Sequence, residues 1–474
     1  MIIRRSGLEI KKDYPEKEHI MNILTRYISE YGNIDYIKKV FYIEDEDGGI
    51  LIPRYYPISD EIVDMSEEGE NIDIESIIEP RNERQRKAID FLINNTKGIL
   101  QLEPGSGKTV VTIAAICKIK KKTIIFAHKD SLIEQWKNEF LKFTNIKKSD
   151  MGRLSSSNYQ KCLKTKKIIF STPHIIPIDL KKDKKIIQCL QNSRIGVMVV
   201  DECHVGIGPE QFSKSSIFIP SKRTFGLSAT PSRSDGNDDL LNYHLGDVTT
   251  FPSEEGELIK PIVFMIYFPF KIYSGFYKYV NWGGKFILSR YYKQMVKSKY
   301  YNKLVSKWIR ESYEKGRKTL VLGKNIKPLL QLISDVGCPK EDVGIFSPGA
   351  KDKKYIKQTD KLTDTMDMDI AFKEKKIVFS TYTACRDGNN RPDLDCLIMS
   401  CPTSNVEQAI GRVLRYKEGK KQPIVLDLVD TEGPMTYCKA LEKKVSMFEN
   451  MSEKRLELYK KKKWDVKIVR IKEK

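Results

Sequence analysis

One short segment carries the residue types that hold the phosphates of a nucleotide. Pro104-Gly-Ser-Gly-Lys-Thr109 follows an apolar run at 98–102 and precedes a stretch with helical periodicity at 110–119. Glycines let backbone N–H groups curl around phosphates, and the N-terminus of the following helix favours anions. Unless the string is a chance surface loop, Lys108 is expected to hold the β- and γ-phosphates and Thr109 the Mg²⁺ ion. The loop residues expected to bind ATP are Gly105, Ser106, Gly107, Lys108 and Thr109.

A pair of carboxylates follows a second apolar run. Asp201-Glu-Cys-His204 comes directly after 197–200, where a carboxylate reaches a metal at the carboxyl edge of a parallel sheet. Asp201 is expected to bind Mg²⁺ mostly through water. Glu202 is expected to orient and activate the water that attacks the γ-phosphate, because phosphoryl transfer depends on positioning and charge stabilisation. The alternative, solvated charges at a strand end, is disfavoured by the phosphate loop earlier in the chain.

Two arginines and a glutamine late in the chain complete a phosphoryl-transfer set. Within Gln408-Ala-Ile-Gly-Arg-Val-Leu-Arg415, residues 408, 412 and 415 lie three or four apart and share one face of a helix. Arginine carries a permanent charge and meets phosphate oxygens with two N–H groups at once. Gln408, Arg412 and Arg415 are therefore the candidate residues at the γ-phosphate. Without the first two segments they would be an ordinary surface arginine pair.

These segments must be positioned by parallel sheets. Short β-branched runs alternate with amphipathic stretches, and strands buried on both faces with helical crossovers indicate parallel sheets. The fold class predicted is α/β, with two RecA-like doubly wound parallel-sheet domains and a small N-terminal α/β accessory domain. The predicted strands are 98–102, 123–127, 167–171, 196–200 and 224–228 in the first domain, and 318–322, 376–380, 396–400 and 423–427 in the second.

Composition shifts divide the chain into five parts. An acidic stretch from Asp60 to Glu79 has the composition of a linker, and 252–300 is rich in Tyr, Phe and Lys. The expected parts are an accessory, DNA-binding domain at 1–78, an ATP-binding domain at 79–255, a connecting segment at 256–300, a second domain at 301–435 and a basic tail at 436–474. A solvated helix end is the alternative for the tail.

The overall composition favours a polyanionic partner inside a cell. The formal net charge is +20, and neutralising phosphates releases condensed counterions, although a lysine-rich proteome explains the charge equally well. No apolar run approaches the roughly 20 residues of a membrane span, and the polar start does not fit a secretory signal. A cytoplasmic location without membrane partners is expected. The nine cysteines form no C-x-x-C pair, so neither a zinc site nor a disulfide framework is indicated.

The motifs together resemble those of superfamily 2 DExH-type helicases over about residues 80–430. The phosphate loop and Asp201–His204 are similar to motifs I and II, and 408–415 fits motif VI, Q-x-x-G-R-x-x-R. Ser228-Ala-Thr230 resembles motif III, which implies a coupling role for Ser228, Ala229 and Thr230. Gln85 lies where the family carries its adenine-reading Q motif, and its amide can meet an adenine edge; an ordinary surface glutamine is the alternative.

Further segments resemble the nucleic-acid-contacting motifs of that family. Ala127-His-Lys129 is similar to motif Ia and Ser171-Thr-Pro173 to motif Ib, which implies phosphate-backbone contacts for His128, Lys129 and Thr172. His128 is equally compatible with a core histidine. Motif V is present at 380–388, with Asn390 in place of the family's aspartate. It implies nucleic-acid contacts for Thr381 and Tyr382 and ATP contacts for Asp387 and Gly388, although Tyr382 is equally compatible with packing.

Within the superfamily, the residues after motif III and the segment Ile52–Pro57 are similar to the phage UvsW-like and large-virus branch-migration DNA helicases. The resemblance implies an ATP- and Mg²⁺-dependent DNA helicase acting on forks, Holliday-type junctions and single-stranded stretches, in the host-cell cytoplasm if viral. A transcript-releasing or RNA-directed motor is the rival enzyme. A nucleic-acid-binding protein that does not hydrolyse ATP is the rival from another class. The oligomeric state, for which a monomer suffices, and any protein partner are left open.

Overall fold

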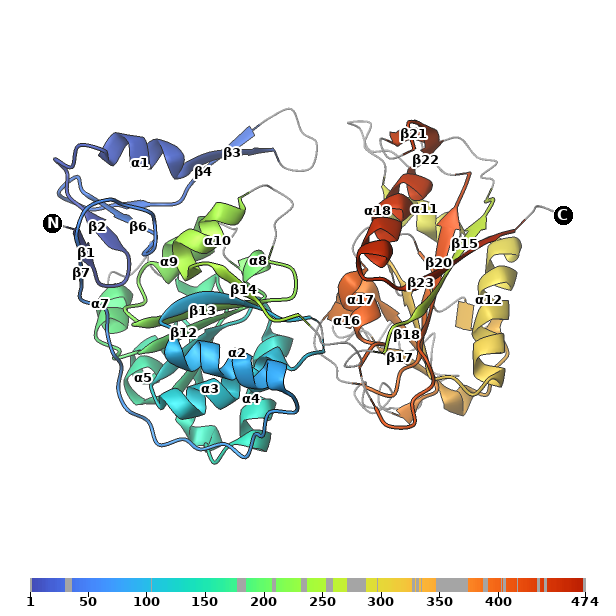
Figure 1. The fold of residues 1–474 in the computed structure, drawn as a ribbon, viewed down its shortest axis with the longest axis horizontal. Coiled ribbons are helices and arrows are strands. Elements are labelled where there is room, and N and C mark those ends of the chain that lie inside the picture. The colour runs from blue at the N-terminus through green and yellow to red at the C-terminus, as the bar shows by residue number, and fades with distance from the viewer. Residues whose placement is uncertain are drawn as a thin grey trace. The chain divides into compact units, whose positions relative to one another are not determined.

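The computed structural model describes the chain except for residues 1, 30–35, 104, 177–184, 207–209, 232–236, 253–258, 271–286, 296, 326–328, 330–331, 334, 347–373, 387–390, 402, 404–405, 416, 433–434, 439–440 and 472–474. The chain divides into two compact units, which we call unit 1 (Met1–Glu254) and unit 2 (Glu255–Lys474). Each unit is described by itself (Figure 1).

A small mixed sheet opens unit 1. Its described strands lie in the order β5-β6-β2-β1-β7; β1 and β7 pair in parallel, and the other neighbours are antiparallel. Leu8, Ile52 and Phe41 pack in its core with Ile20 of helix α1. The elements are β1 (Ile2–Arg4), β2 (Leu8–Ile10), α1 (Lys17–Ile23), β5 (Ile43–Glu44), β6 (Ile50–Ile52) and β7 (Ile62–Asp64), with a separate hairpin of β3 (Thr25–Ser29) and β4 (Tyr36–Val40).

A parallel sheet forms the centre of unit 1. In the part of the chain that is described it has seven strands in the order β10-β11-β9-β12-β13-β8-β14, and every neighbouring pair is parallel. All residues of β9 and β12 are buried, as expected for strands covered on both faces. The strands are β8 (Lys97–Gln101), β9 (Thr123–Phe126), β10 (Met151–Arg153), β11 (Ile168–Ser171), β12 (Val197–Asp201), β13 (Arg223–Ser228) and β14 (Val248–Thr250).

Helices cover both faces of this sheet (Figure 1). Along β9, Ile125 packs in the cluster with α2, α3 and α4, whereas Ile124 and Phe126 pack in the cluster with α5, α7 and α10. Successive strand residues point to opposite faces, so the apolar run fills two cores. The helices are α2 (Glu83–Asn94), α3 (Lys108–Ile119), α4 (Asp130–Phe143), α5 (Tyr159–Thr165), α7 (Lys185–Gln191), α8 (Cys203–Gly206), α9 (Glu210–Ser216) and α10 (Asp238–Leu245), with the 3-10 turn η1 (Lys148–Asp150).

The acidic stretch from Asp60 to Glu79, whose composition indicated a linker, is packed onto this domain. Ile74 is fully buried and Ile72 nearly so, both in the cluster under α2 and α3. Isolated bridges join Glu67 to Ser221 and Asn71 to Lys121. The two isoleucines alternate with acidic residues, so one side of the stretch packs while its charges stay outside.

The N-terminal sheet is anchored to the parallel sheet by one buried arginine. Arg54 donates to the Ser221 carbonyl at 2.8 Å and to the Thr224 hydroxyl at 2.7 Å. It also donates to the carbonyls of Ile219 and Ser216. Burial lowers the pKa of the guanidinium, and the ring of neutral oxygens supplies the hydrogen bonds that a buried charge requires. Leu240 of α10 also packs in the hydrophobic core of the N-terminal sheet.

Unit 2 contains a second parallel sheet. Its described strands lie in the order β17-β18-β16-β19-β20-β15-β23, again with parallel pairs throughout. The strands are β15 (Ile262–Phe268), β16 (Thr319–Gly323), β17 (Val343–Phe346), β18 (Ile377–Thr381), β19 (Cys396–Met399), β20 (Ile424–Asp430) and β23 (Asp465–Arg470), beside a hairpin of β21 (Met435–Cys438) and β22 (Lys443–Ser446).

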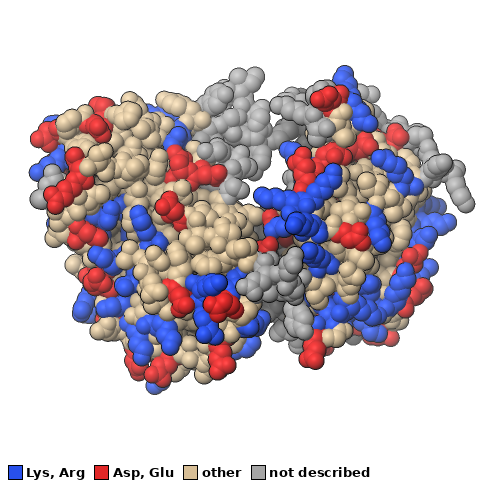
Figure 2. All heavy atoms as spheres, viewed as in Figure 1, with Lys and Arg blue, Asp and Glu red and all other residues tan. Residues whose placement is uncertain are grey.

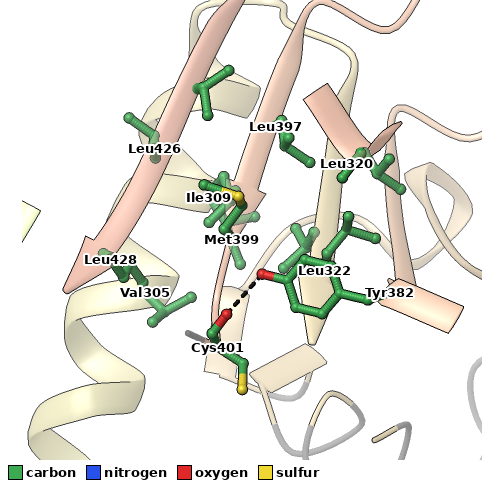
Figure 3. Close-up of a cluster of buried hydrophobic side chains, with 14 of the residues drawn as sticks. Val305, Ile309, Leu320, Leu322, Tyr382, Leu397, Met399, Cys401, Leu426 and Leu428 are labelled. Atoms are coloured by element: carbon green, nitrogen blue, oxygen red, sulfur yellow. Dashed lines mark hydrogen bonds between the residues drawn. The ribbon is translucent and has the colours of Figure 1, made fainter. Parts of the chain in front are cut away.

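Helix α12 packs across the middle of that sheet. Figure 3 shows Val305 and Ile309 of this helix against leucines of β16, β19 and β20. The helices of unit 2 are α11 (Leu288–Met295), α12 (Lys299–Glu314), α16 (Tyr382–Arg386), α17 (Glu407–Gly411) and α18 (Met447–Lys461), with the 3-10 turn η3 (Lys340–Asp342). Among the described residues of both units, no helix combines the length and the apolar character needed to cross a bilayer.

Three strands of this sheet, β15, β17 and β23, lie where no strand was expected. β15 falls within the segment taken as a connector, yet it pairs with β20 along its whole length. β23 falls within the segment taken as a basic tail, and it pairs with β15 at the edge of the sheet. β23 carries charges because an edge strand has exposed positions. The two predicted parallel-sheet domains and the small N-terminal domain are confirmed, and the second sheet extends beyond the predicted runs.

Candidate functional site

The phosphate loop joins β8 to α3 as the sequence predicts. Gly105 and Gly107 have φ of 87° and 88°, a left-handed backbone that favours glycine. A β-carbon on Gly107 would lie 2.8 Å from the Gln85 amide nitrogen, so a side chain there would also displace a neighbour. Helix α3 begins at Lys108, which places the loop at a helix N-terminus.

Gln85 braces this loop. Its amide nitrogen donates to the Ser106 carbonyl at 2.8 Å, and its amide oxygen accepts from the Arg81 backbone at 3.0 Å. The residue is 5% exposed. Asn82 caps helix α2 by accepting from the Gln85 backbone N–H, which fixes the start of that helix. One amide N–H and one oxygen lone pair remain beyond these bonds, so the adenine contact stays a prediction.

The two carboxylates stand at the end of β12. Asp201 is 9% exposed and accepts from Trp136 Nε1 at 2.9 Å and from the Glu202 backbone N–H at 3.0 Å. Burial, followed by the negative charge of Glu202, raises the pKa of Asp201 to about 6. Glu202 has a φ of 47°, a strained backbone for a non-glycine residue, and its carboxylate lies 3.7 Å from Lys108 Nζ.

The oxygen groups present fit a magnesium ion. Mg²⁺ usually takes one or two protein carboxylates together with substrate phosphates and waters. Asp201 would supply a buried carboxylate, and Thr109 in the first turn of α3 would supply a hydroxyl oxygen. In the described part of the chain no group of three or more His, Cys, Asp or Glu residues is placed to hold a metal. An all-protein metal cage is therefore not indicated among these residues.

A short polar link joins the segments that resemble motifs II and III. His204 Nδ1 lies 2.9 Å from Ser228 Oγ and 3.5 Å from a Glu202 carboxylate oxygen. Ser228 Oγ also accepts from the Thr230 backbone N–H at 3.0 Å. The Ala229 carbonyl accepts from the Gln101 amide at 3.2 Å. Displacement of Glu202 can therefore reach β13 through His204.

The residues expected to contact nucleic acid in unit 1 share the edge of the sheet that carries the carboxylates. His128 and Lys129 follow β9, and Thr172 follows the neighbouring strand β11. The Ala127 backbone N–H donates to the Ser171 carbonyl, which keeps the two strand ends in register. All three side chains are half-buried. The structure brings them together, and their contacts to nucleic acid remain predictions.

The arginine segment of unit 2 departs from the single predicted helix. Helix α17 ends at Gly411, and the backbone N–H of Val413 donates to the Ile410 carbonyl in a tighter turn. Arg415 lies beyond the helix, so the expectation of one helix face over 408–415 is wrong, because the helix ends at a residue that disfavours it. Burial and then the charge of Arg412 lower the pKa of Arg415 to about 10. The side chain of Gln408 lies outside the described residues.

Tyr382 is a core residue. It is 8% exposed, and its hydroxyl donates to the Cys401 carbonyl at 2.7 Å (Figure 3). The structure therefore favours packing as the role of Tyr382. Its predicted nucleic-acid contact is withdrawn because the side chain is buried and its hydroxyl is hydrogen-bonded. Thr381 ends β18 half-buried, and its hydroxyl accepts from the Ala384 backbone N–H. Asp387 and Gly388 lie outside the described residues.

Two contributors were absent from the sequence prediction. Trp136 holds Asp201 through its indole N–H, and Arg455 of α18 donates to a carbonyl in the loop before α17. A single tryptophan in a helical stretch gives no signal of a bond to a strand 65 residues away. An arginine in a lysine-rich tail likewise resembles its exposed neighbours.

Two parallel sheets, a phosphate loop after the first strand and paired carboxylates after another agree with the superfamily 2 helicases that the sequence resembles. Residues 77–233 match the family described as "Type III restriction enzyme, res subunit". The chain is 25% identical over 446 residues to the protein L396 of Acanthamoeba polyphaga mimivirus, which carries the name of an ATP-dependent RNA helicase; the match covers 90% of this chain and 78% of that one. The helicase 161L of Invertebrate iridescent virus 6 is 26% identical over 80% of this chain and 79% of its own length.

A further relative covers only part of the chain. The general transcription and DNA repair factor IIH helicase/translocase subunit XPB of Encephalitozoon cuniculi is 31% identical over 31% of this chain and 22% of that protein. Among solved structures, S. cerevisiae Dbp5 bound to RNA and ADP BeF3 aligns with a TM-score of 0.50 at 14% identity, over 82% of this chain and 89% of that one.

The type ISP restriction-modification enzyme LlaBIII bound to DNA aligns with a TM-score of 0.51 at 13% identity, over 83% of this chain and 31% of that one. T4 UvsW aligns over 99% of both chains with a TM-score of 0.37 and 16% identity. The two scores at or above 0.5 show the shared fold. The sequence matches bear out the expected resemblance to superfamily 2 helicases, a family that uses ATP and binds nucleic acid.

Proposed function

We propose that this chain is an ATP-dependent DNA helicase or translocase that couples hydrolysis to unwinding or branch migration of forked and junction DNA. The observation that carries the proposal is the cluster at the carboxyl edge of the first sheet. There Lys108 lies beside Glu202, and His204 links Glu202 to Ser228. This arrangement joins a phosphate-binding lysine, a water-activating carboxylate and the end of strand β13.

In this mechanism the chain's own residues position the reactants. The phosphate loop binds ATP, and Lys108 neutralises the β- and γ-phosphates. Asp201 and Thr109 hold Mg²⁺, which when bound supplies charge stabilisation to the phosphates. Glu202 accepts a proton from the attacking water, while Arg412 and Arg415, with Gln408, stabilise the charge that develops on the γ-phosphate. Asp387 and Gly388 are retained as proposed ATP contacts.

Two features favour DNA as the substrate. The XPB relative is named as a subunit of a DNA repair factor, and the family matching 77–233 is named for a restriction enzyme. The net charge of +20 agrees with any nucleic acid. Figure 2 shows Lys and Arg interspersed with acidic side chains on the viewed face of each unit. Charge alone therefore defines no single binding surface there.

An RNA-directed motor is the second candidate, because the L396 relative is named as an RNA helicase and matches 90% of this chain. For either substrate we propose that His128, Lys129, Thr172 and Thr381 contact the phosphate backbone, and that 1–78 is an accessory nucleic-acid-binding domain. Two relatives are viral, so we further propose that the chain works in the cytoplasm of a host cell.

ATPase and unwinding assays on a matched panel test this proposal. Wild-type turnover is measured with a four-way junction, a fork, single-stranded DNA and an RNA duplex. Junction and fork DNA are expected to stimulate most and to be unwound or branch-migrated with ATP. Stimulation by RNA alone would establish the second candidate. The absence of turnover with every nucleic acid would establish a binding protein without ATPase activity.

Two variants assign the site within the same assay. Lys108→Ala is expected to lose ATP binding or turnover. Glu202→Gln is expected to bind ATP and to hydrolyse it about 10³-fold more slowly, because the γ-phosphate then lacks a water-activating carboxylate. Nucleic-acid-stimulated turnover at the wild-type rate in both variants would contradict the site assignment.

A further inference from the structure

The loop that leads into α17 is held by side chains from distant parts of unit 2. Ser400, Cys401, Thr403 and Val406 are the described residues between the end of β19 and the start of α17. The Tyr301 hydroxyl donates to the Ser400 carbonyl. The Tyr382 hydroxyl donates to the Cys401 carbonyl at 2.7 Å. Buried backbone acceptors that are satisfied in this way resist displacement, because moving them leaves polar groups unpaired.

Arg455 of α18 supplies a third contact to the same loop. Its Nη1 donates to the Thr403 carbonyl at 2.7 Å, while Nε and Nη2 donate to the two Asp427 carboxylate oxygens at 2.8 and 2.9 Å. The side chains of Arg455 and Asp427 are 1% and 2% exposed. Burial works to lower the pKa of Arg455, but Asp427 more than offsets this and raises it. The guanidinium therefore stays charged between its two partners.

The end of α18 also reaches the first residue of α17. Lys462, which follows the helix, pairs with Glu407 at 2.9 Å. Helix α18 is itself fixed against the sheet by Phe448, Ser452 and Tyr459, which are fully buried and share a face with Arg455. One rigid element thus contacts both the loop and the start of the helix that carries the arginine segment.

We propose that Arg455 is a positioning residue for ATP hydrolysis: by holding the Thr403 carbonyl it fixes the start of α17 and hence the placement of Arg412 and Arg415. The inference rests on the proposed role of those two arginines at the γ-phosphate. Arg455 acts through the backbone of the loop. Only a planar guanidinium presents N–H groups to Asp427 and to the Thr403 carbonyl at once, whereas an ammonium offers a single charged point.

Arg455→Lys tests the proposal, because it keeps the charge opposite Asp427 and loses the second reach to Thr403. Nucleic-acid-stimulated kcat is expected to fall about tenfold, with KM for ATP changed by less than about twofold. KM for ATP is expected to change little because the phosphate loop, which binds ATP before the reaction, belongs to unit 1. Steady-state ATPase kinetics and a thermal melt are measured on the full-length protein.

Tyr459→Phe is the matched control. It removes the 2.9 Å hydrogen bond from the Tyr459 hydroxyl to the Asp427 carboxylate. Among the described hydrogen bonds, that hydroxyl makes none to the loop. A loss of stability similar to that of Arg455→Lys, with kcat within about twofold of wild type, is expected. Equal kcat losses in both variants would show a global effect and overturn the inference.

Arg412→Lys separates failure of this inference from failure of the proposed function. Wild-type turnover in Arg412→Lys would overturn both. Strongly reduced turnover there, together with wild-type kcat in Arg455→Lys, would overturn the positioning role alone. If Arg455→Lys does not fold, the neutral double variant Arg455→Gln with Asp427→Asn replaces it. The same loss of kcat is expected in the double variant, and wild-type kcat would overturn the inference.

Discussion

The phosphate-binding segments of unit 1 and the arginine segment of unit 2 are positioned in different ways. In unit 1 the chemistry-bearing residues follow strands of one sheet and contact one another directly, as Lys108 after β8 and Glu202 after β12 do. In unit 2 the arginine segment is preceded by a loop whose carbonyls are held by Tyr301, Tyr382 and Arg455, none of which belongs to the segment itself. One region is organised by strand topology and the other by long-range polar packing.

Because the two regions are positioned in different ways, substitutions in them should differ in how far they change the reaction and how far they change the backbone. A strand end is fixed by the whole sheet, so replacing a carboxylate there removes a reaction step and leaves the backbone in place. A loop held by three buried side chains depends on each of them, since an unpaired buried carbonyl costs about 1–3 kcal/mol. Substitutions in unit 1 should therefore divide cleanly into chemical and structural effects. Those around the loop in unit 2 should combine the two.

The largest effect is expected from breaking the buried ion pair of unit 2. Asp427→Ala leaves Arg455 buried without a carboxylate, which costs about 3–5 kcal/mol and should lower the thermal midpoint strongly. Asp465→Ala is the control, because the ion pair described for Asp465 is an exposed one with Lys467 at 3.9 Å. That variant should shift stability by less than about 0.5 kcal/mol. Equal thermal midpoints for the two variants would show that the pair does not hold the unit together.

Most strands that are apolar on both faces were predictable from the sequence. The runs at 123–127 and 196–200 correspond to β9 and β12, because both faces of these strands are covered. β23 was missed because an edge strand alternates apolar with charged residues, and in a lysine-rich sequence this pattern resembles a solvated tail. β15 was missed although its residues are almost all apolar. The aromatic residues around it led to its interpretation as a connector.

The candidate site divides in the same way. The phosphate loop and the carboxylate pair are each a single run of adjacent residues that directly follows an apolar run. Residue type and spacing therefore predict that each lies at a strand end. The contact of Arg455 with Thr403 spans 52 residues and depends on how α18 packs against β20. No local pattern encodes such a contact. Tyr382 shows the converse error, since its place in a motif predicted a surface role that its packing contradicts.

A smaller effect is expected from the buried carboxylate of unit 1, and it depends on pH. Folding raises the pKa of Asp201 from 3.8 to about 6. A raised folded-state pKa means that the group opposes folding more as pH rises from about 4 through about 6. Asp201→Asn should therefore raise the thermal midpoint of the nucleotide-free protein at pH 8, by about 3 °C for each kcal/mol recovered, and have little effect near pH 4.

Melts of wild type and Asp201→Asn across pH 4 to 8 check this, with Asp150→Asn as the control. Asp150 is partly exposed and forms an ion pair with Lys167 at 3.2 Å. In the sequence it is far from the phosphate loop. A constant difference between wild type and Asp201→Asn over the whole range would contradict the proposed cause. If Mg²⁺ bound together with ATP supplies positive charge to Asp201, adding both should favour the wild type and reduce the difference at pH 8.

The smallest effect is expected from Trp136→Phe, which most directly asks whether unit 1 depends on long-range support as unit 2 does. The change removes the 2.9 Å indole bond to Asp201 and keeps most of the ring packed against Phe140 and the core. That bond favours the charged carboxylate, so its loss should raise the pKa of Asp201 further.

For Trp136→Phe we expect a stability loss of about 1 kcal/mol and a rise of a few-fold in the Mg²⁺ concentration needed for half-maximal ATPase. Because the sheet still places Asp201, kcat at saturating Mg²⁺ should stay within about twofold of wild type. A tenfold fall in kcat at saturating Mg²⁺ would show that the carboxylate edge of unit 1 also relies on a distant side chain for its placement, and the contrast with unit 2 would not hold.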